Sequence, residues 1–174
     1  MRKRVLPYAL AKTLFEIPFS FYEKKGIRIL LLDLDNTLIP YTASSPNQKV
    51  LAWLGEAKKR GLAVHVCSNS AGKRVRKFAS ECGCAAECWM RKPFSGPLKR
   101  LIRQNGWGKD SIVLIGDQIM TDVKAANGAG IRCILTEPLS PKEPPWTKFN
   151  RLFDRPIRKK IVEKGLSKPW EDIL

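Results

Sequence analysis

Short apolar runs alternate with longer amphipathic stretches along the middle of the chain. The clearest runs span residues 27–32, 62–67, 112–115 and 131–135, and a shorter one spans 85–90. Most of them end in polar residues or glycine. Runs that are apolar throughout are typical of strands buried on both faces of a parallel sheet. The pattern therefore predicts a mainly parallel sheet.

Helix start and stop signals fill the gaps between these runs. Ser45-Pro46 is a typical helix start, and Gly61 is a typical stop. Three further helices are predicted over 71–82, 95–105 and 121–127, and each is followed by glycine. Strands that alternate with helices predict an α/β fold with right-handed crossovers, which is a Rossmann-like, doubly wound sheet.

The two ends of the chain differ from this middle part. Residues 1–26 are basic and rich in aromatics, and they predict an amphipathic arm that packs on the domain or lies on a membrane surface. Residues 138–174 are basic and punctuated by proline, with a helix expected only over about 156–164. The predicted organisation is an arm (1–26), a core (27–137) and a surface appendage (138–174).

Apolar length and cysteine pattern both bear on location. No stretch approaches the roughly 20 apolar residues that a membrane-spanning helix needs, and no signal cleavage site is convincing. A cytoplasmic protein is expected, with peripheral contact at the inner face of the membrane as a refinement. Cys82, Cys84 and Cys88 lack the C-x2-C spacing of zinc sites, and His65 is the one histidine, so we expect no zinc site.

The charge is strongly unbalanced. Lys and Arg number 32 against 16 Asp and Glu, which gives a formal net charge of +16. Such a field favours an anionic partner: nucleic acid, an acidic membrane surface or a phosphorylated substrate. Solvated helix faces would produce the same composition, so charge alone does not choose among these.

Polar residues follow the predicted strands. In open α/β sheets, ligands bind at the carboxyl ends of strands. Acidic side chains gathered there repel one another unless a cation lies between them, and Mg2+ prefers such oxygen ligands. The candidates at these strand ends are Asp33, Asp35, Thr37, Ser68, Asn69, Asp117 and Asp122, together with Lys92 before the helix at 95. The expected metal ligands are Asp33, Asp35, Asp117 and Asp122.

These residue types suit phosphoryl transfer. Asp33 is placed to attack phosphorus, and Asp35 to donate the leaving-group proton and later activate water. The phosphoryl group is expected to contact Thr37, Ser68, Asn69 and Lys92, with Lys92 offsetting transition-state charge. Taken singly, such residues are also ordinary turn formers or helix caps. Ser68-Asn69-Ser70 is expected to be cap and phosphate site together.

The motifs resemble a known superfamily. Asp33-Leu34-Asp35-Asn36-Thr37 is similar to the D-x-D-x-T signature of haloacid-dehalogenase-like (HAD) enzymes. Ser68, Lys92 and the stretch from Gly116 to Asp122 resemble its other three motifs, in the same order. An acid at position 35 implies a phosphatase or mutase.

The resemblance narrows to the YqeG family of IIIA-type phosphatases. It rests on Arg91-Lys92-Pro93, the run from Gly116 to Val123, and Phe149-Asn150-Arg151. That family is similar to mitochondrial and plastid phosphatidylglycerophosphate phosphatases, which implies a Mg2+-dependent enzyme of phospholipid biosynthesis. Gly128 is a local departure, since many relatives are expected to carry a bulkier residue there.

The chain has no room for a lid domain. Residues 38–62 and 69–92 each hold about one helix, whereas a folded lid needs tens of residues more. A capless, open site suits a phosphate on something large, such as a lipid, a protein or a nucleic acid. The best-guess substrate is phosphatidylglycerophosphate, and the basic arm would then meet an anionic membrane.

Other functions remain open on the sequence. An RNA- or ribosome-associated binding protein with a secondary phosphatase site would fit the charge, although no recognisable RNA-binding motif supports it. A phosphatase for another macromolecular or small phosphomonoester would use the same residues. A phosphotransferase or mutase would also use Asp33 and Asp35.

Overall fold

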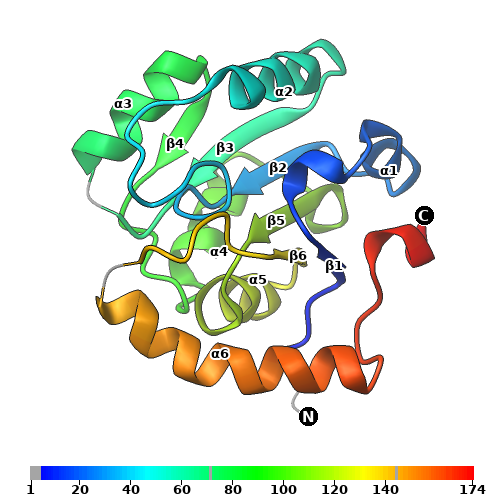
Figure 1. Cartoon of the computed structure of the whole chain (residues 1–174). Coiled ribbons are helices and arrows are strands. Elements are labelled where there is room, and N and C mark those ends of the chain that lie inside the picture. Colours follow the sequence, from blue (N-terminus) through cyan, green and yellow to red (C-terminus); the bar gives the residue numbers. More distant parts are fainter. Residues whose placement is uncertain (1–4, 71, 144) are drawn as a thin grey trace.

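Six parallel strands form one sheet in the order β1-β6-β5-β2-β3-β4 (Figure 1). The computed structural model describes residues 5–70, 72–143 and 145–174. The strands are β1 (Ala9–Ala11), β2 (Ile29–Leu32), β3 (Ala63–Cys67), β4 (Ala85–Glu87), β5 (Ile112–Gly116) and β6 (Arg132–Thr136). The five runs predicted from the sequence all contain strands, and the doubly wound α/β fold is confirmed.

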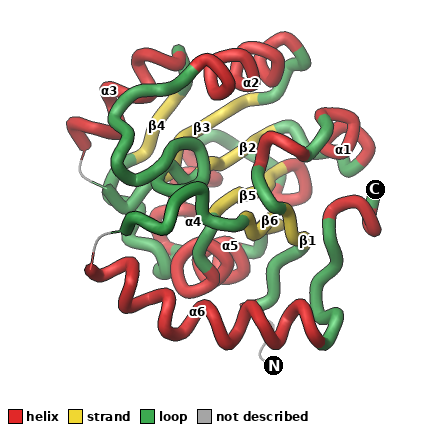
Figure 2. The backbone as a smooth tube through the Cα atoms, viewed as in Figure 1, coloured by secondary structure: helices red, strands yellow, loops and turns green. Residues whose placement is uncertain are grey.

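Helices cover both faces of the sheet (Figures 1 and 2). One apolar core lies under α1, α2 and α3, and a second lies under α4, α5 and the second half of α6. The helices are α1 (Phe19–Lys24), α2 (Gln48–Lys59), α3 (Gly72–Cys82), α4 (Gly96–Gln104), α5 (Lys124–Ala129) and α6 (Pro145–Glu163).

Strand β2 lies at the centre of this arrangement. Leu30 and Leu32 point into the first core, whereas Ile29 and Leu31 point into the second. Because β2 pairs in parallel with both β3 and β5, the carboxyl ends of all three strands meet at one edge. Asp33 follows β2 directly at that edge.

The N-terminal segment packs on the core. Strand β1 pairs with β6 at the edge of the sheet, and Phe21 and Tyr22 of α1 are buried. Three residues are too few to show a strand pattern, so β1 was not predicted. Residues 1–4, the first basic cluster of the predicted arm, lie outside the described residues.

Helix α6 is longer than predicted. The expected helix over 156–164 was wrong at its start, because α6 begins at Pro145 and carries Pro156 in its interior. A proline there removes one backbone hydrogen bond. Buried side chains on both sides of it hold the helix in place: Asp154 before it and Ile161 after it.

Two other helix boundaries also differ from expectation. Helix α2 begins after Asn47, whose Oδ1 accepts a hydrogen bond from the backbone N–H of Val50 at 2.9 Å, and the predicted start at Ser45-Pro46 was wrong. Helix α5 ends at Ala129, beyond the predicted end at Asn127, and Gly130 after it has the left-handed φ of 77° that favours glycine. Gly128 lies inside α5, where a Cβ would come within 3.0 Å of the Ser95 side chain.

The two segments expected to be too short for a lid domain hold one helix each in their described parts. In their described parts, residues 38–62 contain α2 and residues 69–92 contain α3 and β4 as their helices and strands. Ala71, the expected first residue of α3, lies outside the described residues. Among the helices that the structure describes, none is long and apolar enough to cross a membrane.

Candidate active site

A pocket opens at the carboxyl ends of β2 and β3. Asp33 and Asp35 reach it from the turn after β2, and Ser68 and Asn69 reach it from the turn after β3. Lys92 lines it from the loop between β4 and α4. The remaining wall includes Gln118 and Thr121 after β5, and Thr147 and Asn150 on α6.

Lys92 lies at the centre of the charged groups. Its Nζ donates hydrogen bonds to Asp33 Oδ1 and Asp122 Oδ1, both at 2.6 Å, and to the carbonyl oxygen of Cys67 at 2.8 Å. Burial lowers the pKa of Lys92, but Asp122 and Asp33 outweigh that effect and raise it above its usual value. Lys92 is therefore a fixed positive charge beside Asp33.

Asn69 holds the Lys92 loop. Its Oδ1 accepts from the backbone N–H of Lys92, and its Nδ2 donates to the Lys92 carbonyl oxygen, both at 2.8 Å. Ser68 is buried, and its Oγ accepts from the backbone N–H of Ser70 at 3.0 Å. The structure places Ser68 and Asn69 in the pocket with Asp33, and their contact with phosphate stays a prediction.

Three carboxylates come together beside Lys92. One oxygen from each of Asp33, Asp117 and Asp122 lies within 4.8 Å of the others. Burial raises the pKa of Asp33 well above its usual value, the carboxylates of Asp122 and Asp117 raise it further, and Lys92 opposes them. Burial also raises the pKa of Asp117 to about 7. A second cation would stabilise the ionised form of this cluster.

One buried oxygen in the cluster lacks a partner. In the part of the chain that the structure describes, no group donates a hydrogen bond to Asp117 Oδ1. A buried carboxylate oxygen without a partner is costly, and oxygen ligands of this kind suit Mg2+. The donor set of Asp33, Asp117 and Asp122 therefore fits the expected metal ion.

Asp122 is packed beneath the strand that precedes it. Its Oδ2 accepts from the backbone N–H of Gln118 at 3.1 Å, while its Oδ1 contacts Lys92. A Cβ on Gly116 would come within 2.3 Å of the Asp122 carboxyl carbon. Glycine at position 116 is therefore what allows the Asp122 carboxylate to reach Lys92.

Asp35 and Thr37 lie apart from the three carboxylates. Asp35 lines the pocket, but its carboxylate accepts hydrogen bonds from Ser70 Oγ at 2.5 Å and from the guanidinium of Arg74. Thr37 is buried, and its Oγ1 has no hydrogen-bond partner among the described residues. The metal contact of Asp35 and the phosphate contact of Thr37 stay predictions.

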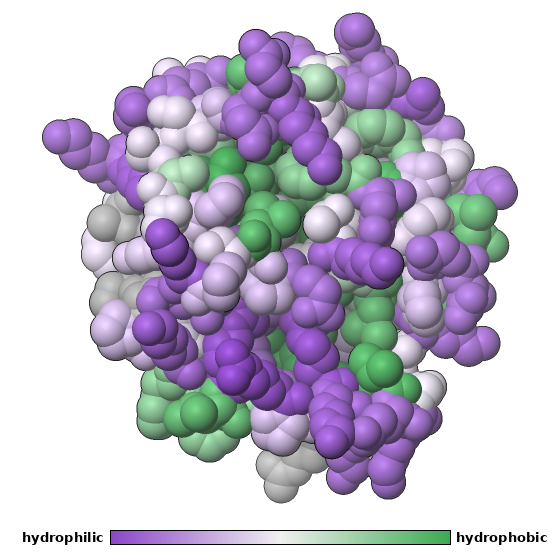
Figure 3. Space-filling view, viewed as in Figure 1, coloured by the Kyte–Doolittle hydropathy of each residue, from purple (hydrophilic) through white to green (hydrophobic). Residues whose placement is uncertain are grey.

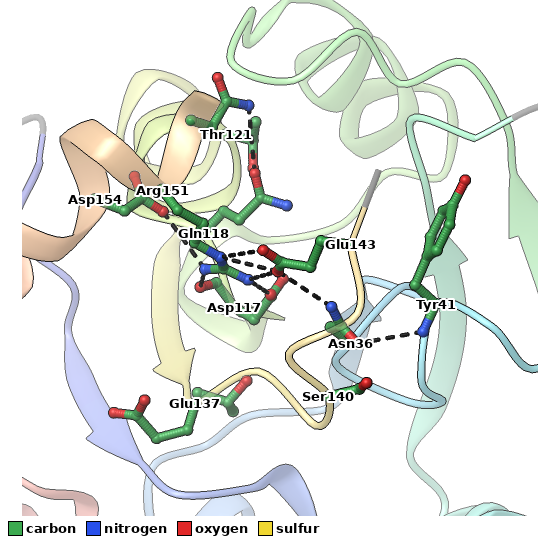
Figure 4. Close-up of polar contacts among 12 residues, drawn as sticks. Asn36, Tyr41, Asp117, Gln118, Thr121, Glu137, Ser140, Glu143, Arg151 and Asp154 are labelled. Atoms are coloured by element: carbon green, nitrogen blue, oxygen red, sulfur yellow. Dashed lines mark hydrogen bonds and ion pairs between the residues drawn. The ribbon is translucent and has the colours of Figure 1, made fainter. Parts of the chain in front are cut away.

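Helix α6 adds a second charged network behind Asp117 (Figure 4). The guanidinium of Arg151 donates to the Asp117 carbonyl oxygen at 2.7 Å, to the Asp117 carboxylate, and to Glu143 Oε1 at 2.6 Å. Asp154 accepts from the backbone N–H groups of Ile119 and Met120 at 3.0 and 2.9 Å. Arg151 therefore fixes one oxygen of Asp117 and leaves Oδ1 unpartnered.

Sequence reasoning did not assign this network a role. In the sequence, Arg151 stands out only through the Phe149-Asn150-Arg151 resemblance, and no pattern singles out Glu143, Asp154 or Arg74. The sequence signal for Arg151 was its place in that motif, on a segment expected to be an appendage. Its distance from Asp117 along the chain, 34 residues, hides the contact.

Comparison with known proteins agrees with the geometry. A family model described as mitochondrial PGP phosphatase matches residues 1–87, and a HAD-hydrolase-like model matches residues 89–138. The chain is 30% identical over 172 residues to the probable phosphatase YqeG of Bacillus subtilis, covering 99% of both chains. It is 28% identical to phosphatidylglycerophosphate phosphatase 1 of Arabidopsis thaliana, with 95% of this chain and 50% of that protein covered.

Solved structures share the fold at lower identity. A hypothetical protein from Xanthomonas campestris superposes with a TM-score of 0.55 at 18% identity, covering 82% of this chain and 78% of that one. The 3-deoxy-D-manno-octulosonate 8-phosphate phosphatase of Moraxella catarrhalis, solved with magnesium and phosphate, gives 0.53 at 20% identity, covering 70% and 75%. Since the match to YqeG extends over nearly the whole length of both proteins, the chain belongs to the YqeG family of HAD-superfamily phosphatases.

Proposed function

We propose that this phosphatase is Mg2+-dependent, works through an aspartyl-phosphate on Asp33 and acts on phosphatidylglycerophosphate. The observation that carries the proposal is the cluster of Asp33, Asp117 and Asp122 around Lys92 at an open pocket. Mg2+ held by these carboxylates would offset negative charge on the phosphoryl oxygens and on the cluster itself. The remaining chemistry belongs to side chains of this chain.

The first step forms a bond between an Asp33 oxygen and phosphorus. As the bond from phosphorus to the alcohol oxygen breaks, Asp35 gives a proton to the departing alcohol. In the second step Asp35 takes a proton from water, whose oxygen attacks phosphorus. Inorganic phosphate leaves, and the Asp33 carboxylate is regenerated. The contacts of Asp35 with Ser70 and Arg74 hold it at the pocket wall meanwhile.

Lys92 and Ser68 serve the transition state. Lys92 Nζ is 2.6 Å from Asp33 Oδ1. It therefore lies beside the carboxylate whose Oδ1 or Oδ2 becomes bonded to phosphorus. A buried ammonium at that place stabilises developing negative charge without reorganising. Ser68 presents its hydroxyl from the facing turn. Both residues are therefore expected to bind the phosphoryl group more strongly in the transition state than in the bound phosphate ester.

Two observations support a lipid substrate. The Arabidopsis relative is named for phosphatidylglycerophosphate, and the matching family model carries the same description. The pocket has no lid domain over it in the described structure, so a headgroup that remains attached to a large body could enter.

The test is phosphate release from phosphatidylglycerophosphate in mixed micelles. An aryl phosphate and a set of soluble phosphomonoesters are measured in parallel, with Mg2+ and with EDTA. We expect the lipid to give the highest kcat/KM and EDTA to abolish turnover of every substrate. Faster turnover of a soluble phosphomonoester would contradict the lipid assignment, and full activity in EDTA would contradict the metal assignment.

Replacing Arg151 with Met is expected to weaken the use of Mg2+. The variant keeps an unbranched apolar stem but removes the guanidinium whose hydrogen bonds fix Asp117, and groups that orient metal ligands are typically worth about 10–100-fold in metal affinity or activity. We expect the half-saturating Mg2+ concentration to rise by about that factor with an aryl phosphate. Mn2+ binding followed by electron paramagnetic resonance gives a second readout without turnover.

Arg28→Met is the matched control for this variant. Arg28 is exposed next to the amino end of β2, so the same change of residue there should leave Mg2+ use unaltered. Equal Mg2+ dependence in the Arg151→Met variant and the wild type would show that Arg151 does not position Asp117.

A further inference from the structure

Large apolar side chains are exposed on the outer face of α6. Phe149, Leu152 and Phe153 are 60%, 66% and 48% exposed. Figure 3 shows an apolar patch over the N-terminal half of this helix. The ring centroids of Phe149 and Phe153 are 5.4 Å apart, and the two ring planes make an angle of 72°. The spacing i, i+3 and i+4 puts the three side chains on one stripe.

The inner face of the same turns lines the active site. Thr147 and Asn150 form part of the pocket wall, and Arg151 contacts Asp117. The apolar stripe is therefore turned away from the protein at the very segment that borders the pocket. Packing within the protein therefore does not explain why these three side chains are apolar.

Two further large apolar side chains are exposed in the loop that carries Lys92. Trp89 and Phe94 are 63% and 71% exposed. They stand on either side of Lys92, in the loop between β4 and α4 that brings Lys92 into the pocket. We call Trp89, Phe94, Phe149, Leu152 and Phe153 the mouth surface.

The exposed charges around the mouth surface are basic. Lys148, Arg155 and Lys159 are exposed on α6, and Arg91, Lys99 and Arg100 are exposed beside Trp89 and Phe94. The acidic residues of α6 are Asp154, which is buried, and Glu163, which is its last residue. Apolar side chains interleaved with cations are typical of helices that lie at a membrane interface.

We propose that the mouth surface docks on an anionic lipid bilayer, with the open pocket facing the headgroups. The proposal deepens the proposed function, on which it rests, by naming the surface that meets the membrane. Leu152 has no ring on which a nucleic-acid base could stack, which favours lipid over RNA. A second copy of this chain would bring two sets of basic residues together, and the net charge of +16 opposes that.

This surface differs from the N-terminal arm that the sequence suggested for membrane contact. Phe21 and Tyr22 of that segment are buried in the core, and β1 is paired with β6. Their apolar area is therefore used within the protein. The mouth surface instead leaves its apolar area free and lies beside the catalytic pocket.

The experiment is sedimentation with large vesicles of zwitterionic phosphatidylcholine, with and without 30% phosphatidylglycerol. We expect the wild type to bind the vesicles that contain phosphatidylglycerol and not those of phosphatidylcholine only. Added salt should weaken this binding, because the basic residues contribute to it. The triple variant Phe149→Ser, Leu152→Ser and Phe153→Ser should bind at least about tenfold more weakly. Its turnover of a soluble aryl phosphate and its melting temperature report whether the fold and pocket are intact.

Leu51→Ser with Leu174→Ser is the matched control, since both leucines are exposed away from the mouth surface. This control should bind vesicles like the wild type. Equal binding by the triple variant and the control would overturn the proposal, as would wild-type indifference to lipid charge. RNA is added to the vesicle-bound wild type, and RNA binding by the triple variant is measured in parallel. If RNA displaces the wild type from the vesicles and binds the triple variant more weakly, the surface belongs to nucleic acid.

The outcomes separate docking from substrate choice. If the wild type binds anionic vesicles through the mouth surface but hydrolyses only soluble phosphomonoesters, the docking surface stands and the lipid substrate fails. If phosphatidylglycerophosphate is hydrolysed in micelles while the triple variant binds vesicles unchanged, the substrate stands and the docking surface fails.

Discussion

Replacing Asp33 with Asn is expected to lower kcat for an aryl phosphate by about 10⁴-fold or more. An amide cannot form the acyl-phosphate, and loss of a covalent nucleophile is among the largest single-residue effects in enzymes. The measurement is phosphate release at saturating Mg2+. Burial and the carboxylates of Asp122 and Asp117 outweigh Lys92 and raise the pKa of Asp33, so a neutral Asn relieves repulsion and the melting temperature in EDTA should not fall.

Asp110→Asn is the matched control, because Asp110 is exposed in the short 3-10 helix Lys109–Ser111 before β5 and lies outside the carboxylate cluster. It should turn over at the wild-type rate. Trapping of radioactive phosphate on the wild type, and its absence in the Asp33→Asn variant, would identify the nucleophile directly. A variant that retained more than a few per cent of activity would exclude the aspartyl-phosphate on Asp33.

Replacing Lys92 with Met should damage both stability and turnover. The change leaves Asp33 and Asp122 without the ammonium that lies 2.6 Å from each. Removing one partner from a buried ion pair typically costs about 3–5 kcal/mol. We expect the free energy of unfolding by urea, measured in EDTA, to fall by about that amount, and kcat to fall by about 10³-fold.

A double variant separates the two effects. Lys92→Met combined with Asp122→Asn removes one of the unpaired carboxylates, so part of the lost stability should return while turnover stays low. Lys58→Met, on the exposed face of α2, is the matched control and should change neither quantity. Unchanged unfolding of the Lys92→Met variant in EDTA would mean that the buried ion pairs contribute nothing to the fold.

Local pattern was sufficient to predict the central sheet and the residues at its edge. The strands β2 and β5 are apolar and buried along their whole length, because helices cover both of their faces, and β3 is apolar except for His65. Parallel pairing then brings the turns after them to one edge, which is why Asp33, Ser68 and Asp117 could be grouped from the sequence. That step needs topology alone and no side-chain detail.

Contacts between distant segments were not predictable in the same way. Strand β1 forms because the backbone of β6 is available for pairing on that side of the sheet, and the three residues of β1 carry no strand pattern of their own. Helix α6 continues through Pro156 because Asp154 and Ile161 anchor it to the core, which local propensity does not reveal. The bond from Arg151 to Asp117 joins the two segments only after both have folded.

The order of the chain has a consequence for its synthesis. β1 leaves the ribosome early, but its partner in the sheet is β6, so β1 can pair only after β6 has been synthesised. Arg151 emerges later still, and until then Asp117 lacks the guanidinium that holds its carboxylate. A nascent chain therefore carries Asp33, Ser68 and Lys92 before it carries a complete site. The growing polypeptide should gain its full phosphatase activity only when α6 has been made and has docked.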